Sequence, residues 1–251
     1  MKIHHLLALT PLLPISAMAG SLPIDNSARL SIGANVGYVA SAYDTDNKVS
    51  ILPQAFYDNN RLYLEGAEGG VYVYKDAQHQ VRIGLTYDGR SFDPDDAKND
   101  ALKQLDERKT SVQAHASYMR ITPIGGIKIK ATTDISGRHD GSTLSLSHLS
   151  KFTHGKATLY PAFGLTWHSE DYNQYYYGVS VNEAQRSGIA AYQAKDGISP
   201  FVSATLNYDL TDKITLFGNQ RVEWLSSSQK DSPMTDGSIN STTRLGLTYN
   251  F

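Results

Sequence analysis

The end of the chain constrains the fold more than any other segment. Residues 241–251 read STTRLGLTYNF, and from Leu245 onward apolar and polar side chains alternate until the chain stops at an aromatic residue. Successive side chains of a strand point to opposite faces, so one face of this strand would be apolar and the other polar. A strand that is apolar outside, polar inside and closed by a terminal aromatic residue is typical of an outer-membrane β-barrel.

The start of the chain has the three parts of a secretory signal peptide. A short polar segment with Lys2 precedes the apolar residues 6–15, and the small-x-small triplet at residues 17–19 forms a cleavage site. A transmembrane anchor is the alternative, but it needs about 20 apolar residues. We therefore predict a signal peptide over residues 1–19 and a mature barrel domain over residues 20–251, located in the outer membrane of a Gram-negative bacterium after export through the inner membrane.

The composition of the mature part excludes several classes of protein. No long apolar run remains after residue 19, so only a closed barrel could cross a bilayer. The chain has no cysteine, which excludes disulfides and thiolate metal sites. The net charge of −2 gives no sign of nucleic-acid binding. The 16 tyrosines suit the aromatic girdles of a barrel, although tyrosine also simply favours strands.

Segments of about ten alternating residues recur along the chain, including two short strands around the Gly-rich residues 66–70. We predict an all-β, transmembrane antiparallel β-barrel of about twelve strands, with ten as the alternative. A soluble β-sandwich would also alternate, but it would not require the two kinds of connection that the sequence predicts. These are short turns near 58–60, 75–79, 122–125, 153–155 and 211–212, and long loops at 39–48, 89–108, 169–198 and 226–240.

Ten charged residues fall on the predicted inner face of the barrel. Charges inside a barrel can line a channel or pair across it and close it. Twelve strands leave room for a narrow pore unless a loop folds in, and the long Tyr-rich segment 169–198 is the candidate plug. The candidate lumen residues are Arg29, Arg82, Asp88, Lys128, Lys130, Asp134, Asp209, Arg221, Glu223 and Arg244.

Three irregular segments carry a resemblance to a known family. Residues 175–197 read YYYGVSVNEAQRSGIAAYQAKDG, residues 105–108 read LDER and residues 231–234 read DSPM. In this order they resemble the MipA/OmpV family of outer-membrane barrels, and the resemblance covers essentially the whole mature chain. The resemblance implies an outer-membrane barrel, and we predict that residues of the long Tyr-rich segment form the plug or contact a partner. The residues concerned are Tyr175, Tyr176, Tyr177, Gly178, Ser180, Glu183, Arg186, Ser187, Gly188 and Tyr192.

The family resemblance also implies partners. The family's namesake resembles a scaffold that joins a lytic transglycosylase to a peptidoglycan synthase, and we expect both as candidate partners here. Outer-membrane lipid surrounds any such barrel. Tyr249 and Phe251 resemble the signal that the bacterial barrel-assembly machinery reads during biogenesis.

Candidate catalytic groups are weak in this sequence. A Ser–His site needs both side chains within reach and a group that orients the histidine. Ser147 and His148 point to opposite faces of a strand, whereas His115 and Ser117 share a face but lack an acid at a determinable position. Acids in residues 93–96, DPDD, and those beside His168 fit solvated loops better than a protease site or a calcium site.

The sequence therefore favours one function over two others. We predict a non-enzymatic outer-membrane barrel with a scaffold role for peptidoglycan-remodelling enzymes, and without a cofactor or metal. A narrow channel for small solutes is the alternative, because the predicted lumen is charged. An outer-membrane lipase or protease is a distant third.

Overall fold

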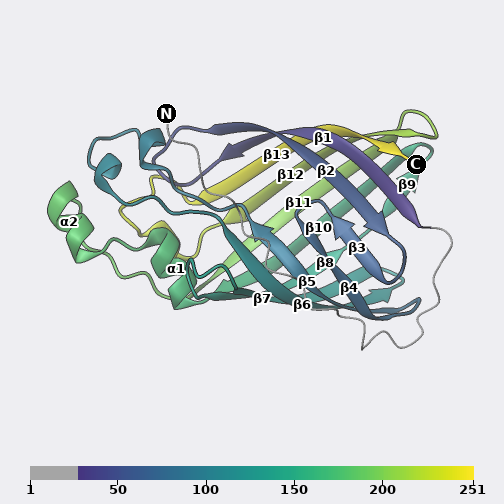
Figure 1. Ribbon diagram of the computed structural model, residues 1–251, viewed down its shortest axis with the longest axis horizontal. Coiled ribbons are helices and arrows are strands. Elements are labelled where there is room, and N and C mark those ends of the chain that lie inside the picture. Colours follow the sequence, from purple (N-terminus) through teal and green to yellow (C-terminus); the bar gives the residue numbers. More distant parts are fainter. Residues whose placement is uncertain (1–27) are drawn as a thin grey trace, which may run out of the picture.

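The computed structural model describes residues 28–251, so the predicted signal peptide lies outside the described residues (Figure 1). The chain forms a single antiparallel sheet with helical turns in the loops at one end. The strands are β1 (Arg29–Ala40), β2 (Lys48–Asp58), β3 (Leu62–Glu65), β4 (Glu68–Lys75), β5 (His79–Asp88), β6 (Ser111–Thr122), β7 (Gly125–Asp134), β8 (Ser142–Leu149), β9 (Phe152–His154), β10 (Ala157–His168), β11 (Gly197–Asp209), β12 (Ile214–Trp224) and β13 (Ile239–Asn250).

The sheet closes on itself and forms a barrel. The last strand, β13, pairs with β1 from Ser31 opposite Asn250 to Ala40 opposite Ser241. Segments β8 and β9 both pair with β10, at different heights, so they act as one interrupted strand. The thirteen segments thus occupy twelve positions around the barrel, and the prediction of twelve strands is confirmed.

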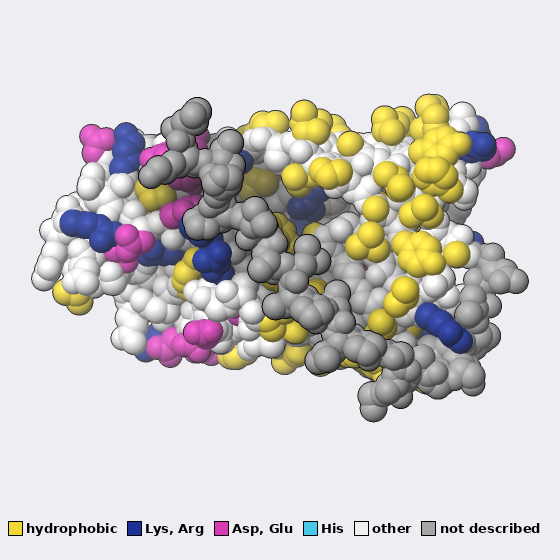
Figure 2. Space-filling model, in the orientation of Figure 1, with side chains coloured by type: hydrophobic (Ala, Val, Ile, Leu, Met, Phe, Trp, Pro, Cys, Tyr) yellow, Lys and Arg dark blue, Asp and Glu magenta, His cyan; other side chains and the backbone are white. Residues whose placement is uncertain are grey.

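The outer face of the wall is apolar, as the alternation predicts. Ile51, Phe163 and Leu245 expose 76%, 59% and 63% of their surface. Figure 2 shows hydrophobic side chains gathered over the barrel and charged side chains gathered over the loop end. No helix within residues 28–251 is long and apolar enough to span a bilayer.

Two rings of outward aromatic residues mark the height of the bilayer. One ring lies at the loop ends of the strands and consists of Tyr38, Tyr87, Trp167 and Trp224. The other lies at the turn ends and consists of Tyr57, Tyr74, Tyr118, Tyr208 and Tyr249. Aromatic girdles of this kind sit at the two membrane interfaces. Since short turns face the periplasm, the loop end is extracellular.

The extracellular loops contain helical turns that the alternation does not reveal. They are η1 (Pro94–Asp96), η2 (Leu102–Gln104), α1 (Glu170–Tyr177), α2 (Val181–Ser187) and α3 (Ser227–Lys230). The segment 169–198, predicted as a continuous loop, therefore contains two helices. Its local signal was present, because Ser180 and Glu183 form a capping box at the start of α2.

The largest buried apolar cluster lies in these loops and not in the barrel. Its members come from the loops that follow β1, β5, β10 and β12. We call this loop assembly the cap, because α1 lies over the extracellular end of the barrel (Figure 1). Its buried residues are Ala42, Tyr43, Phe92, Ala97, Leu102, Leu105, Tyr172, Tyr176, Tyr177, Val179, Ala194, Leu225 and Met234.

Candidate functional site

The charged residues predicted for the inner face all occupy inward register positions. Arg244 of β13, for example, pairs with Gly37 of β1, which pairs with Ser50 of β2. The next residues along these strands, Leu245, Val36 and Ile51, are apolar and point outward, so Arg244 points inward. The same alternation places the other nine on the lumen side or at its rim. They are Arg29, Arg82, Asp88, Lys128, Lys130, Asp134, Asp209, Arg221 and Glu223.

One group of inward side chains fills the lumen beside β3, β4 and β5. Arg82 donates to Glu65 at 2.9 Å and to the hydroxyl of Tyr72 at 2.8 Å. Its guanidinium carbon also lies 4.6 Å from the ring centre of Tyr63 and 4.7 Å from that of Tyr72. A cation between two aromatic faces gains from both rings. Arg82 is therefore held in place, and its charge is satisfied within the wall.

A second set continues this group onto β6 and β7. Lys130 forms an ion pair with Glu68, and the hydroxyl of Tyr63 lies 2.8 Å from Nε2 of His115. Nε2 of His115 is also 3.6 Å from Glu68. These charges pair along one side of the lumen, from β4 to β7. On this side of the barrel the paired side chains fill part of the lumen, and Glu68 also lines the larger cavity described below.

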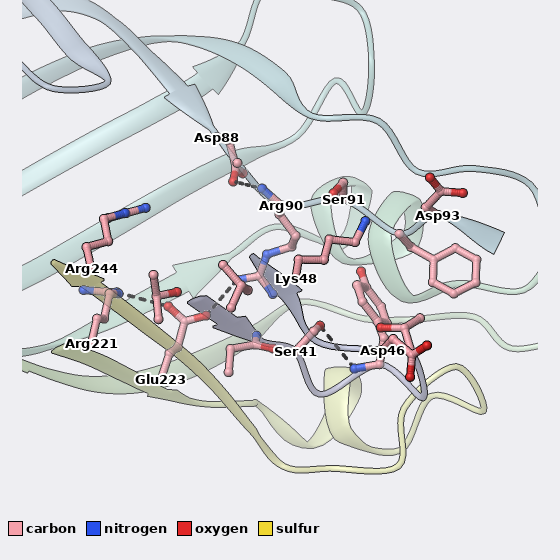
Figure 3. A pocket seen from close by; sticks show the side chains of 17 residues that line it. Ser41, Asp46, Lys48, Asp88, Arg90, Ser91, Asp93, Arg221, Glu223 and Arg244 are labelled. Atoms are coloured by element: carbon pink, nitrogen blue, oxygen red, sulfur yellow. Dashed lines mark hydrogen bonds and ion pairs between the residues drawn. The ribbon is translucent and has the colours of Figure 1, made fainter. Parts of the chain in front are cut away.

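A third group lies where the lumen meets the cap (Figure 3). Arg90 donates to Glu223 at 2.7 Å, and Arg221 donates to the same carboxylate at 3.1 Å. The guanidinium of Arg90 also contacts the hydroxyl of Tyr177, while its backbone N–H donates to Asp88 at 3.0 Å. This ion-pair cluster therefore joins β5 and β12 to helix α1 of the cap.

Arg244 differs from these paired cations. It lines a cavity of about 280 Å³ under the cap and also a larger cavity of about 990 Å³ deeper in the lumen. Within residues 28–251 it makes no hydrogen bond or ion pair, and Figure 3 shows it beside the linked Arg221 and Glu223. Its guanidinium is thus available to a ligand between the two cavities.

The three segments that carry the family resemblance meet in the cap. Arg108, in the LDER segment, donates to Glu183 of α2 at 2.6 Å and to the carbonyl of Gly178 at 3.1 Å. Ser232, in the DSPM segment, donates to the carbonyl of Tyr177 at 2.6 Å. Segments separated by up to about 125 residues in sequence therefore form one assembly.

Glu183 is the centre of this assembly. Its side chain and that of Arg108 are only 4% and 8% exposed. Burial opposes ionisation of Glu183, but hydrogen bonds from the backbone N–H groups of Ser180 and Asp106, and the contact with Arg108, outweigh it and lower the pKa of the carboxyl to about 2. Glu183 is therefore ionised at neutral pH, and it satisfies Arg108 and two backbone donors at once.

The residues predicted for the plug or partner contact belong to the cap. Tyr176 and Tyr177 are fully buried, and Tyr192 donates to the carbonyl of Ser228 at 2.8 Å. Gly188 ends α2 with a positive φ of 75°, which suits a residue without a side chain. The segment covers the mouth rather than filling the lumen. The remaining members, Tyr175, Gly178, Ser180, Arg186 and Ser187, make cap and helix-end contacts.

Sequence reasoning did not single out a Ser–His contact in the cap. Ser111 Oγ lies 3.1 Å from Nε2 of His139, and both residues are buried. Nδ1 of His139 accepts from the backbone N–H of Gly141 at 2.9 Å, so a neutral ring carries its proton on Nε2. Burial lowers the pKa of His139 and keeps the ring neutral. Nε2 then donates to Ser111, and this tautomer cannot act as its base.

The other catalytic candidates have structural surroundings. His115 contacts Tyr63, and His168 is 3% exposed beneath α1. Asp93 accepts from the backbone N–H of Asp95 at 3.0 Å and so caps η1, while Asp96 pairs with Lys48 at 2.7 Å. The described residues contain no group of three or more His, Cys, Asp or Glu side chains arranged to hold a metal ion.

Comparisons with known proteins agree with this architecture. The family model of MltA-interacting protein MipA matches residues 32–251. The chain is 32% identical to MltA-interacting protein of Escherichia coli (strain K12), over 89% of this chain and 90% of the relative. It is 27% identical to outer membrane protein OmpV of Vibrio cholerae serotype O1, over 68% of this chain and 66% of the relative.

A third relative, the 24 kDa outer membrane protein of Pasteurella multocida (strain Pm70), is 24% identical over 95% of both chains. The relatives and the barrel agree on an outer-membrane location, as the sequence predicts. The family model covers nearly all of the described barrel and its cap. This chain belongs to the MltA-interacting protein MipA family of outer-membrane β-barrels.

Proposed function

We propose that this protein is an outer-membrane anchor that holds a lytic transglycosylase at the periplasmic face of the membrane. The observation that carries the proposal is its 32% identity to MltA-interacting protein over 90% of that relative. A peptidoglycan synthase is the second partner that the family resemblance implies. Such a role needs a rigid body in the membrane and an accessible periplasmic rim, and it needs no open pore.

The geometry supports an anchor in two ways. The cap lies over the extracellular end, and ion pairs fill one side of the lumen beside β3–β7. A partner in the periplasm would meet the short turns instead. A groove of about 390 Å³ lies at this rim, between two turns and the end of β13. It is lined by Gly155, Lys156, Asp209, Thr211, Asp212 and Asn250.

The test is direct binding with the groove altered. The mature protein in lipid nanodiscs is titrated with a purified lytic transglycosylase of the MltA type. We expect the charge-reversed variant Lys156→Glu/Asp212→Lys to bind at least about tenfold more weakly, a loss of about 1.4 kcal/mol. The matched control is Asp100→Lys/Lys103→Glu, which reverses an exposed ion pair on the extracellular side. Absence of binding by the unaltered protein would contradict the proposal.

A narrow channel is the second candidate. It is favoured by the cavity of about 990 Å³ inside the barrel and by Arg244, which has no ion-pair partner within residues 28–251. Planar-bilayer recordings of the refolded mature chain test it, with heat-modifiable gel mobility to prove that the barrel is folded. Discrete current steps would favour the channel. A folded but silent barrel would remove it.

A further inference from the structure

The barrel wall is interrupted between β2 and β5. β2 pairs with β3 only through Phe56, Tyr57 and Asp58, because β3 is four residues long. On this side of β2 no strand within residues 28–251 pairs with residues 49–54, although all of them pair with β1 on the other side. Figure 1 shows β3 as a short arrow beside the long ribbon of β2. The unpaired edge is about 20 Å long at 3.4 Å per residue.

This interruption is a framed window. Its lower border is the two-residue turn between β3 and β4, where Gly66 donates to the carbonyl of Ala55 and Tyr87 donates to the carbonyl of Ala67. Its upper border is the loop after β5, which is held to β2 by a bridge between Thr45 and Ala97 and by the Lys48–Asp96 ion pair. The opening is therefore bounded above and below, and it is not a frayed strand end.

The window lies at the depth of the membrane. At one end of the window Val49 is opposite Tyr38 of the extracellular girdle. At the other end Ala55 is opposite Ile32, two residue pairs from Tyr57 of the periplasmic girdle. The outward side chains of Val49 and Ile51 are 69% and 76% exposed. Lipid chains thus face the window from outside, because the outward surface beside it is apolar.

The edge strand carries a feature suited to an unpaired position. The carbonyl of Ala55 faces the turn below, so the backbone groups of Pro53 and Ile51, two and four residues earlier, face the window. Proline has no N–H group, which removes one donor that would otherwise lack a partner in lipid. The sequence of β2 is therefore compatible with a lasting opening at this point.

Inside the window two inward residues of β2, on either side of the polar Gln54, are apolar. Leu52 and Phe56 point inward on β2, where a water-filled barrel would carry polar residues, and they remain 46% and 39% exposed. Both line the cavity of about 990 Å³, together with Pro53, Tyr87 and Phe217. Figure 2 shows a hollow on this face of the barrel. The cavity is thus open to the side and has an apolar strip at its entrance.

A cation that has no hydrogen-bond or ion-pair partner within residues 28–251 lies above this strip. Arg244 reaches across Gly37, where an added Cβ would lie 3.9 Å from its Cγ and 3.1 Å from Oγ of Ser50 on β2. Arg244 pairs with Gly37, which is next in the chain to Tyr38 of the extracellular girdle; Tyr38 in turn pairs with Val49. Arg244 therefore lies near the level where lipid headgroups meet their chains.

We propose that the window is a lateral binding site for an anionic lipid of the surrounding bilayer. One acyl chain enters between β2 and β5 and packs on Leu52 and Phe56, while the anionic headgroup pairs with Arg244. The lipid would cover the apolar strip, neutralise the guanidinium and fill the gap in the wall. This site is independent of any periplasmic partner, because it opens to the bilayer and not to the turns.

The first test asks whether acyl chains reach the inside of the barrel. The chain lacks cysteine, so single variants Leu52→Cys, Ile51→Cys and Ser203→Cys can each carry one fluorophore. Each is placed in bilayers whose lipids are brominated on the acyl chain. We expect quenching at inward Leu52 comparable to that at outward Ile51, and weak quenching at Ser203, which is inward on the closed wall of β11. A Leu52 probe quenched no more than the Ser203 probe would overturn the site.

The second test concerns the headgroup. In the Leu52→Cys background we expect brominated phosphatidylglycerol to quench about fivefold more strongly than brominated phosphatidylcholine at equal content. This ratio is what the attraction of one Lys or Arg to an anionic membrane surface gives. Arg244→Gln should bring this ratio to about one, by the same reasoning. The control Lys151→Gln removes another cation that lines the same cavity and should keep the preference. An unchanged preference in Arg244→Gln, in barrels shown to be folded, would overturn the role of Arg244.

Discussion

The cap and the lumen are filled by different kinds of side chain. Both must fill the space enclosed by twelve strand positions. The cap does so with an apolar cluster around Tyr176 and Met234, both fully buried, as in a small soluble domain. The lumen does so with ion pairs such as Arg82–Glu65 and leaves a cavity of about 990 Å³. Most hydrogen bonds of the wall need neither filling, because the strand ladder satisfies them; within residues 28–251 an exception, described above, is the run 49–54 of β2, which pairs on one side only.

Because the cap and the lumen are filled by different contacts, we expect each to lose its structure without the other. The cap depends on contacts between distant loops, and its central ion pair is more deeply buried than the Lys130–Glu68 pair of the lumen, at 8% and 4% exposure against 20% and 14%. Damage to the cap should therefore loosen the extracellular end and leave the barrel closed.

The largest effect is expected from Glu183→Ala. It leaves Arg108 buried without its partner, which costs about 3 to 5 kcal/mol of the local stability of the cap. Native-state hydrogen exchange should show faster exchange at residues 102–108 and 178–188, with the strands unchanged. The control Glu170→Ala breaks the exposed Lys195 pair and should cost less than about 1 kcal/mol. Equal effects of the two variants would contradict the distinction between cap and surface.

The next largest effect is on the pH dependence of the cap. Because the folded-state pKa of Glu183 is lowered to about 2, its contribution is complete above the ordinary glutamate range and is lost as the pH falls toward about 2. The lowered pKa corresponds to about 3 kcal/mol. Pulsed pepsin cleavage within residues 178–188 should rise steeply between about pH 4 and pH 2. In Glu183→Gln that rise should be absent, and a rise of the same size there would assign the effect to another group.

A smaller effect is expected from Ser232→Ala. Its hydroxyl is buried and donates to the carbonyl of Tyr177, so removal leaves a buried acceptor without this donor. The loss should be about 1 to 2 kcal/mol of cap stability. Ser227→Ala, at an exposed position of the same loop, serves as the control. Hydrogen exchange at α1 would reveal the loss, and no change there would show that the DSPM segment does not support the helix.

The smallest effect is expected from Gly188→Ala. The positive φ of 75° at this position disfavours any residue with a side chain by about 1 kcal/mol. Exchange at the last turn of α2 should accelerate, while η2 and the barrel stay unaffected. A more stable helix in this variant would mean that its end can adopt another conformation.

The barrel can be predicted from the sequence because the pattern that specifies it, the alternation of apolar and polar residues, is local. Each strand separates lipid from lumen, so the alternation at Leu245, Leu247 and Tyr249 reports the fold by itself. The inward charges follow from the same alternation. The helices of the cap were missed because they are short and lie in polar, Tyr-rich loops. The signals of a helix start were the Ser180–Glu183 and Ser226–Gln229 capping boxes and the N-cap Ser169.

The alternation alone predicts the barrel, about twelve strands and the side to which strand residues point, because one face of each strand meets lipid and the other meets the lumen. The tertiary structure was needed to show that Arg108 meets Glu183 across 75 residues, that His139 donates a hydrogen bond to Ser111, and that β3 is too short to cover the edge of β2. These outcomes depend on where distant loops pack and on strand register, which a local pattern does not encode.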